Sequence, residues 1–307
     1  MVTRPEDSLA HLQPESRTTA LLPEAARLRL LRTERWWIAN GQAQAALARL
    51  DILLHDGPGQ IRPPNLLLAG PTNNGKSWIV ERFRRTHAGA PREDAENLPI
   101  VVMQMPTEPT VSRFYSTLLA NLGAPVPTGG SAARKQAMEQ LAVRVLRGVG
   151  ARVLVIDELH NMLAGTRTNR GEFLNLLRWI GNELRLPIVG VGTRDAWLAI
   201  RTDPQLENRF EPFVLPPWRP GPEAARLLQG FATLLPLRCA SDLRGAETVR
   251  SVIARTGGTI GEIAALLRSA AETAILGGEE SITPGVLDRA AYLGPGERRQ
   301  AIERELA

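Results

Sequence analysis

The stretch NLLLAGPTNNGKS at residues 65–77 decides the fold. Its first five residues form an apolar run typical of a buried strand, and the other eight match the phosphate-loop pattern G-x-x-x-x-G-K-[ST]. Glycines let such a loop curl so that successive N–H groups point at phosphate oxygens, and the following helix adds partial positive charge. The pattern predicts a nucleotide site at Gly70, Pro71, Thr72, Asn73, Asn74, Gly75, Lys76, Ser77 and Trp78.

A second chemical signal follows the apolar run VLVI at residues 153–156, where Asp157 and Glu158 come next. Carboxylates at the end of a buried parallel strand lie beside the phosphate loop. We expect Lys76 to reach the β- and γ-phosphates of ATP. Ser77 and Asp157 are expected to hold Mg²⁺, and Glu158 to orient the attacking water. Alone, the acidic pair equally fits a strand that ends in solvated acids, but the phosphate loop favours the functional interpretation.

Short apolar runs alternate with helical patterns over the middle of the chain. Besides the run at residue 65, the runs of four to seven residues are 99–105, 152–156, 187–191 and 212–215. The helical patterns between them are 78–86, 111–122, 134–147, 171–186 and 195–200. Strands without alternation, separated by helices, predict an α/β fold with a parallel five-stranded sheet covered by helices.

The pattern of apolar residues divides the chain into four expected parts. Residues 1–60 carry helical patterns and are expected to form an N-terminal helical extension. Residues 61–216 hold the strand runs and are expected to form the ATPase core. Past Trp218 only helical patterns remain, so residues 217–291 are expected to form a helical lid and residues 292–307 a charged tail.

Composition excludes several classes of protein. The single cysteine, Cys239, rules out an internal disulfide or a cysteine-based zinc site, and the four histidines lack metal-ligand spacing. The longest uncharged stretch, residues 114–133, contains Pro and Gly, so we expect a cytoplasmic protein without a membrane span. The net charge of +5 permits nucleic acid as a partner without proving it. No Asn-Lys-x-Asp motif is present, which disfavours a Ras-like GTPase.

Three later polar residues have two interpretations each. Thr193 ends the fourth strand run, where it could sense the γ-phosphate or cap the next helix. Arg209 precedes the fifth run and could be an arginine finger for a neighbouring subunit, or an ion pair between Glu207 and Glu211. His160 is expected to orient Glu158 or cap a turn rather than to act in catalysis.

These features together look like an AAA+ ATPase, and longer segments resemble the TniB family of transposition ATP-binding proteins, which is related to TnsC. Besides the phosphate loop, the matching segments are QMPTEPTVSRFY (104–115), VLVIDELHNMLAG (153–165), EFLNLLRWIGNELRLPIVGVGTRDA (172–196) and QLENRFEPF (205–213). The resemblance extends from LPEAARLRLLRTERW (22–36) to YLGPGERRQ (292–300), which is nearly the whole chain.

The resemblance implies an ATP-dependent DNA-binding regulator of transposition. Such a protein binds double-stranded DNA with little sequence preference, forms a homo-oligomeric ring or filament, and engages a TniA-like DDE transposase, with a TniQ-like protein as a further partner. By position, Lys76, Ser77, Asp157 and Glu158 inherit the ATPase roles. Thr193 matches the first sensor position, and Arg209 matches the finger.

Some residues cannot be assigned firmly by the resemblance. Many AAA+ lids carry a second sensor arginine after a Gly-Gly pair, but residues 257–262 read GGTIGE, and Arg268 lies two turns further on. Thr110 and Arg113 are weak candidates for DNA contact, against a helix-surface role for Arg113. Two other functions stay open, namely a helicase loader of the IstB or DnaC type and a non-hydrolysing adaptor with structural ATP.

Overall fold

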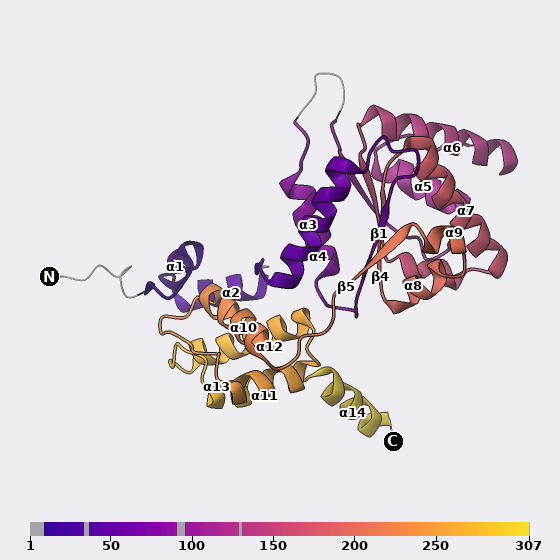
Figure 1. Ribbon diagram of the computed structural model, residues 1–307. Helices are drawn as coiled ribbons and strands as arrows, with labels where there is room; N and C mark the ends of the chain where they lie inside the picture. Colours follow the sequence, from indigo (N-terminus) through magenta and orange to yellow (C-terminus); the bar gives the residue numbers. More distant parts are fainter. Residues whose placement is uncertain (1–8, 34–36, 91–95, 129–130, 307) are drawn as a thin grey trace. The chain divides into compact units, whose positions relative to one another are not determined.

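The computed structural model describes residues 9–33, 37–90, 96–128 and 131–306, and these fall into two compact units (Figure 1). The sheet unit comprises Gly41–Pro216. The helical unit comprises the residues up to Asn40 together with those from Pro217 onward. Each unit has its own cluster of buried apolar side chains.

A parallel five-stranded sheet forms the centre of the sheet unit, as the sequence predicted. The strands are β1 (Asn65–Ala69), β2 (Ile100–Gln104), β3 (Val153–Asp157), β4 (Ile188–Gly192) and β5 (Phe210–Val214). Their order is β2-β3-β4-β1-β5, and every neighbouring pair is parallel. All residues of β1 and β4 are buried, because helices cover both faces of the sheet. Because every neighbouring pair of strands is parallel, the carboxyl ends of all five strands lie along one edge of the sheet.

Helices flank this sheet on both sides. They are α3 (Gly41–Asp56), α4 (Lys76–Thr86), α5 (Val111–Asn121), α6 (Ser131–Gly148), α7 (Arg167–Leu184), α8 (Arg194–Ile200), α9 (Pro204–Glu207) and the 3₁₀ helix η2 (Leu159–Ala164). Figure 1 shows α3 and α4 on one side and α5, α6 and α7 on the other. The buried residues of α5 recur at helical spacing, and its Phe114 meets Phe173 of α7 edge to face at 5.4 Å.

The helical unit contains seven α-helices in its described residues. They are α1 (Pro14–Ala20), α2 (Glu24–Thr33), α10 (Pro222–Leu234), α11 (Ala246–Thr256), α12 (Ile260–Leu276), α13 (Pro284–Arg289) and α14 (Pro295–Leu306). Helix α12 is central, because Ile263, Leu266, Leu267 and Ala270 are fully buried along one face. None of the helices in the described part of the chain has the length and apolar character needed to cross a membrane.

The N-terminal residues divide differently from the expected extension over residues 1–60. Helix α2 packs against α12 in the helical unit, whereas α3 packs against α4 and β1 in the sheet unit. Arg27 of α2 is 2% exposed and forms a two-pronged ion pair with Glu280, with nitrogen–oxygen distances of 2.6 and 2.7 Å. The amphipathic pattern of these helices predicted their existence, but it carries no information on which unit each one joins.

We expect Arg27→Ala to lower the free energy of unfolding of the helical unit by about 3–5 kcal/mol, because the change leaves the Glu280 carboxylate without its main partner. Burial alone would raise the pKa of Glu280, but the hydrogen bonds from Arg27 and Arg238 lower it overall. The stabilisation is therefore present above the ordinary pKa of 4.5 and lost as the pH falls. Urea denaturation across pH measures both effects. The control is Arg32→Ala, whose exposed pair with Glu272 should contribute at most about 1 kcal/mol.

Candidate phosphate-binding site

The loop between β1 and α4 has the backbone of a phosphate cradle. Asn73 (φ 59°) and Gly75 (φ 82°) adopt the left-handed conformation, which glycine takes without strain and asparagine tolerates. Gly75 is the N-cap of α4, and its carbonyl accepts the first helical hydrogen bond from Ile79 N–H at 3.0 Å. The N–H groups of residues 75–78 therefore have no partner within the helix and are available to an anion.

Lys76 lies folded over this loop. Its Nζ donates to the carbonyl oxygens of Gly70 at 2.9 Å and Pro71 at 2.7 Å, and the side chain is nearly buried. Burial lowers the pKa of the ammonium group, while the nearby charges of Glu158 and Asp157 oppose that shift. Phosphate oxygens would be stronger acceptors for this ammonium group than the two neutral carbonyls that now hold it.

Ser77 and Asp157 join the loop to the acidic pair. Ser77 Oγ donates to Asp157 Oδ2 at 2.6 Å, and the other oxygen, Oδ1, accepts from Glu158 N–H at 2.8 Å. These two side chains supply a hydroxyl and a carboxylate oxygen side by side, which are donors that suit Mg²⁺. The described residues contain no cluster of three or more His, Cys, Asp or Glu side chains around a metal position. The donor set thus fits an ion that takes its other ligands from phosphate and water.

Glu158 and His160 form a contact at the start of η2. Glu158 has left-handed backbone dihedrals (φ 54°, ψ 37°), which is uncommon for a residue other than glycine. Its Oε2 lies 3.1 Å from His160 Nε2. The other ring nitrogen of His160, Nδ1, is buried and has no hydrogen-bond partner among the described residues. The structure therefore places His160 beside the carboxylate that the sequence assigned to the attacking water.

Thr193 follows β4 at the same edge of the sheet. It occupies the N-cap position of α8, but its hydroxyl makes no capping hydrogen bond. Thr193 Oγ1 is buried and lacks a hydrogen-bond partner within the described part of the chain. A buried hydroxyl without a partner is costly, which favours a role in contacting a ligand over the capping role.

Arg209 lies at the opposite end of the sheet from the phosphate loop. It directly precedes β5, and its carbonyl oxygen accepts from the N–H of Asn65, the first residue of β1. Its side chain donates to Asn182 Oδ1 at 2.9 Å, and it forms no ion pair with any residue that the structure describes. Partial burial and the charges of Arg62 and Arg178 lower the pKa of Arg209. The structure thus does not bring Arg209 to its own chain's phosphate loop.

The remaining candidates occupy helix termini in both units. Thr110 is the N-cap of α5 and its Oγ1 accepts from Arg113 N–H at 3.2 Å, while both residues are exposed. Trp78 lies in the first turn of α4, and its side chain is 45% exposed. Its backbone N–H has no partner within the helix, so this N–H is what Trp78 offers to the phosphate site. Glu262, in the segment where the sequence departs from the second-sensor pattern, is bound by Tyr292 Oη and by Arg298, each at 2.7 Å.

The sequence pattern did not reveal what the Asn74 side chain does. Its Nδ2 donates to the carbonyl oxygens of Leu215 at 3.0 Å and Pro216 at 3.3 Å, and the residue is 5% exposed. Gly70 also lies against this segment, since a Cβ there would come within 2.7 Å of Leu215 O. Asn74 occupies a variable position of the phosphate-loop pattern, so no signal in the motif predicts a contact with residues so far along the chain.

The sheet order, the loop after β1 and the acidic pair after β3 define an AAA+ P-loop NTPase fold. The chain belongs to the TniB family, because residues 27–220 match the model of the family described as Bacterial TniB protein. No curated protein matches the chain.

Solved structures show the same fold. The ORC2 protein of Aeropyrum pernix, solved as ADPNP-ADP complexes, is 18% identical with a TM-score of 0.59, over 85% of this chain and 71% of that one. The ORC1 protein of the same organism, in complex with DNA, is 20% identical with a TM-score of 0.55, over 91% and 70%. Drosophila ORC bound to DNA is 17% identical with a TM-score of 0.56, over 91% and 67%.

Proposed function

We propose that the protein is an ATPase that binds DNA in its ATP-bound, oligomeric state and regulates transposition. The contact of Ser77 Oγ with Asp157 Oδ2 carries the proposal, because it joins the phosphate loop to the acidic pair in the arrangement that Mg²⁺–ATP requires. Membership of the TniB family supports the role in transposition. Structures of similar fold have been solved as complexes with ADPNP and ADP or with DNA, which supports nucleotide and DNA as ligands.

In this proposal the residues divide the work of ATP hydrolysis. The loop N–H groups and Lys76 bind the phosphates, and Ser77 and Asp157 hold Mg²⁺, which neutralises charge on the phosphates. Glu158 orients the attacking water and accepts its proton, with His160 fixing the carboxylate. The unpartnered hydroxyl of Thr193 contacts the γ-phosphate. Residues 217–291 act as the lid, and Thr110 and Arg113 contribute to the DNA-binding surface.

ATP would act as the switch for assembly in this proposal, and the transposase as the target. A ligand that binds only the assembled state stabilises that state by mass action. The oligomer on DNA then recruits or activates a TniA-like DDE transposase, with a TniQ-like protein as a further partner.

A helicase loader is the alternative within the same fold class. Affinity capture with the ATP-bound protein distinguishes them, because it recovers a transposase in one case and a replicative helicase in the other.

Sedimentation with a short random-sequence duplex tests the proposal most directly. The protein is run with ATP, with ADP and without nucleotide, each with and without DNA. A large complex that needs both ATP and DNA is the expected result. A monomer under all conditions would overturn the nucleotide-gated assembly and favour the adaptor.

Arg209→Ala should leave ATP affinity within about twofold and lower hydrolysis by about 10- to 150-fold, the effect of a lost hydrogen bond to a charged group. The reason is that Arg209 lies at the far end of the sheet and can serve only the nucleotide of another subunit. Phosphate release measures the loss, with the exposed Arg201→Ala as the control. Mixing Arg209→Ala with Lys76→Ala subunits should restore part of the activity, since some interfaces then carry both defects and leave others with both wild-type residues. Failure of the mixture to regain activity would contradict the trans role.

A further inference from the structure

Four arginine side chains near the starts of α5, α6 and α7 make no hydrogen bond or ion pair with any residue that the structure describes. They are Arg113 of α5, Arg134 of α6, and Arg167 and Arg170 of α7. The first three side chains are exposed. Arg170 is half-buried, and its Nε is buried without a hydrogen-bond partner. A buried donor without an acceptor is costly, so Arg170 points to a ligand that supplies acceptor oxygens.

The starts of these three helices lie together in the sheet unit. Helix α5 follows β2 and α7 follows β3 through η2, and these two parallel strands end at the same edge of the sheet. A Cβ on Gly165, just before α7, would come within 2.7 Å of Pro109 Cγ, just before α5. Lys135 pairs with Glu172 at 3.5 Å near the starts of α6 and α7, and a second ion pair of 2.8 Å joins their ends. The two helices therefore run side by side in the same direction (Figure 1), and the four arginines form one surface, the arginine surface.

The arginine surface carries more positive than negative charge. Besides its four arginines it holds Lys135, and the carboxylates nearby are Glu108, Glu139 and Glu172. Lys135 neutralises Glu172, so the four arginines face two remaining acids. A guanidinium group stays charged at every physiological pH and donates several hydrogen bonds in a fixed plane. A ligand that suits this surface therefore presents several anionic oxygens.

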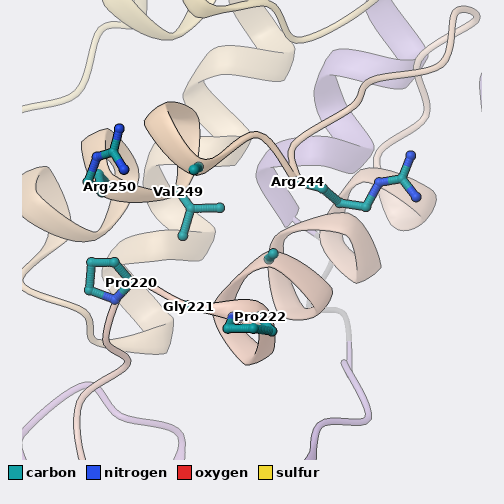
Figure 2. A pocket seen from close by; sticks show the side chains of 8 residues that line it. Pro220, Gly221, Pro222, Arg244, Val249 and Arg250 are labelled. Carbon is teal, nitrogen blue, oxygen red and sulfur yellow. The ribbon is translucent and has the colours of Figure 1, made fainter.

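A pocket at the start of α11 is the main rival for an anionic ligand (Figure 2). Its volume is about 380 Å³, and Figure 2 shows Arg244 and Arg250 on two sides of it. Arg244 already pairs with Asp242 at 3.0 Å, and Glu247 lies in the first turn of α11. Of the two pocket arginines, only Arg250 has no carboxylate partner among the described residues. The balance of charge thus favours the arginine surface over the pocket.

We propose that the arginine surface binds the sugar–phosphate backbone of double-stranded DNA, with Arg167 and Arg170 as principal contacts. Each phosphate carries one negative charge, and its oxygens can accept two parallel hydrogen bonds from one guanidinium group. Such contacts fix the position of the duplex but carry no sequence information. The inference rests on the proposed function for DNA as the partner. It extends the surface that Arg113 begins to α6 and α7.

The test measures binding of a short random-sequence duplex by the full-length chain with ATP, over a range of salt concentrations. Arg167→Ala with Arg170→Ala should weaken binding at least about tenfold. The slope of log affinity against log salt should become shallower by about 1.8, since each lost phosphate contact removes about 0.9. Fluorescent-nucleotide titration without DNA shows whether the nucleotide site of the variant is intact.

Two further variants make the result specific. Arg167→Lys with Arg170→Lys keeps both charges, so it should retain most of the salt slope, whereas a purely structural role for the arginines would not be restored in this way. The matched control is Arg244→Ala with Arg250→Ala, which removes the two pocket arginines and should bind the duplex as the wild type does.

The outcomes separate this inference from the proposed function. A wild-type chain that binds no duplex with ATP would overturn both. If the wild type binds but Arg167→Ala with Arg170→Ala keeps the same affinity and salt slope, only the arginine surface is wrong. A loss of DNA binding in the pocket variant alone would assign the DNA to the pocket. An alanine variant that binds duplex normally but loses a protein in affinity capture would make the surface a protein-binding one.

Discussion

Glu158→Gln should lower ATP hydrolysis about a thousandfold and leave ATP affinity nearly unchanged. The carboxamide keeps the size of the carboxylate, but it cannot accept a proton from the attacking water, and general bases contribute about 10²–10⁴ in rate. Because Glu158 makes no contact with the phosphate loop beyond its charge on Lys76, binding should change little. The variant should therefore stay assembled on DNA. Phosphate release, fluorescent-nucleotide titration and sedimentation with duplex measure the three quantities.

Two comparisons make this result specific. Glu183→Gln, an exposed carboxylate on α7 paired with Arg147, is the control for the charge change and should hydrolyse ATP normally. His160→Ala should reduce hydrolysis less than Glu158→Gln does, because it removes only the group that positions the carboxylate. Normal DNA release by Glu158→Gln would favour the adaptor, in which ATP is structural and never hydrolysed.

Local sequence patterns predicted most of the sheet unit, because the apolar run of each strand and the motif of the phosphate loop both consist of adjacent residues. The predicted ends of helices and strands were less accurate than the prediction that these elements exist. Helix α7 begins at Arg167 rather than 171, because Thr166 caps it by accepting from Asn169 N–H at 3.2 Å. Strand β5 begins at Phe210 rather than 212, because the buried Phe210 pairs with Asn65 of β1. Both shifts depend on interactions that the hydrophobic pattern alone does not contain.

Contacts between residues far apart along the chain could not be predicted from the sequence. The two-pronged Arg27–Glu280 pair assigns α2 to the helical unit, but neither residue lies in a recognisable motif. Similarly, the bonds from Asn74 to Leu215 and Pro216 join positions far apart in the chain. For Thr193 the sequence left a sensor and a cap equally open, and only the unpartnered hydroxyl favours the sensor. Such choices depend on tertiary packing, which brings together residues that are far apart in the chain.

Lys76→Ala should weaken ATP binding by at least about a hundredfold and abolish ATP-dependent DNA binding. A buried charged hydrogen-bonding group contributes about 2–5 kcal/mol to binding of its partner, and every 1.4 kcal/mol is a factor of ten. Lys76 Nζ is held between two loop carbonyls in a nearly buried position, so no other described cation can replace it at that point. Fluorescent-nucleotide titration measures the first effect, and sedimentation with duplex DNA measures the second.

The chain offers a matched control, because its only other lysine is Lys135. Lys135 is partly exposed on α6 and forms a surface pair with Glu172, so Lys135→Ala should bind ATP and DNA normally. Thermal unfolding without nucleotide must be similar for both variants, since loss of the bonds to Gly70 and Pro71 could otherwise disturb the loop. If Lys76→Ala loses ATP but still assembles on DNA, then nucleotide is not the switch, and DNA binding must arise from charge that is present in every nucleotide state.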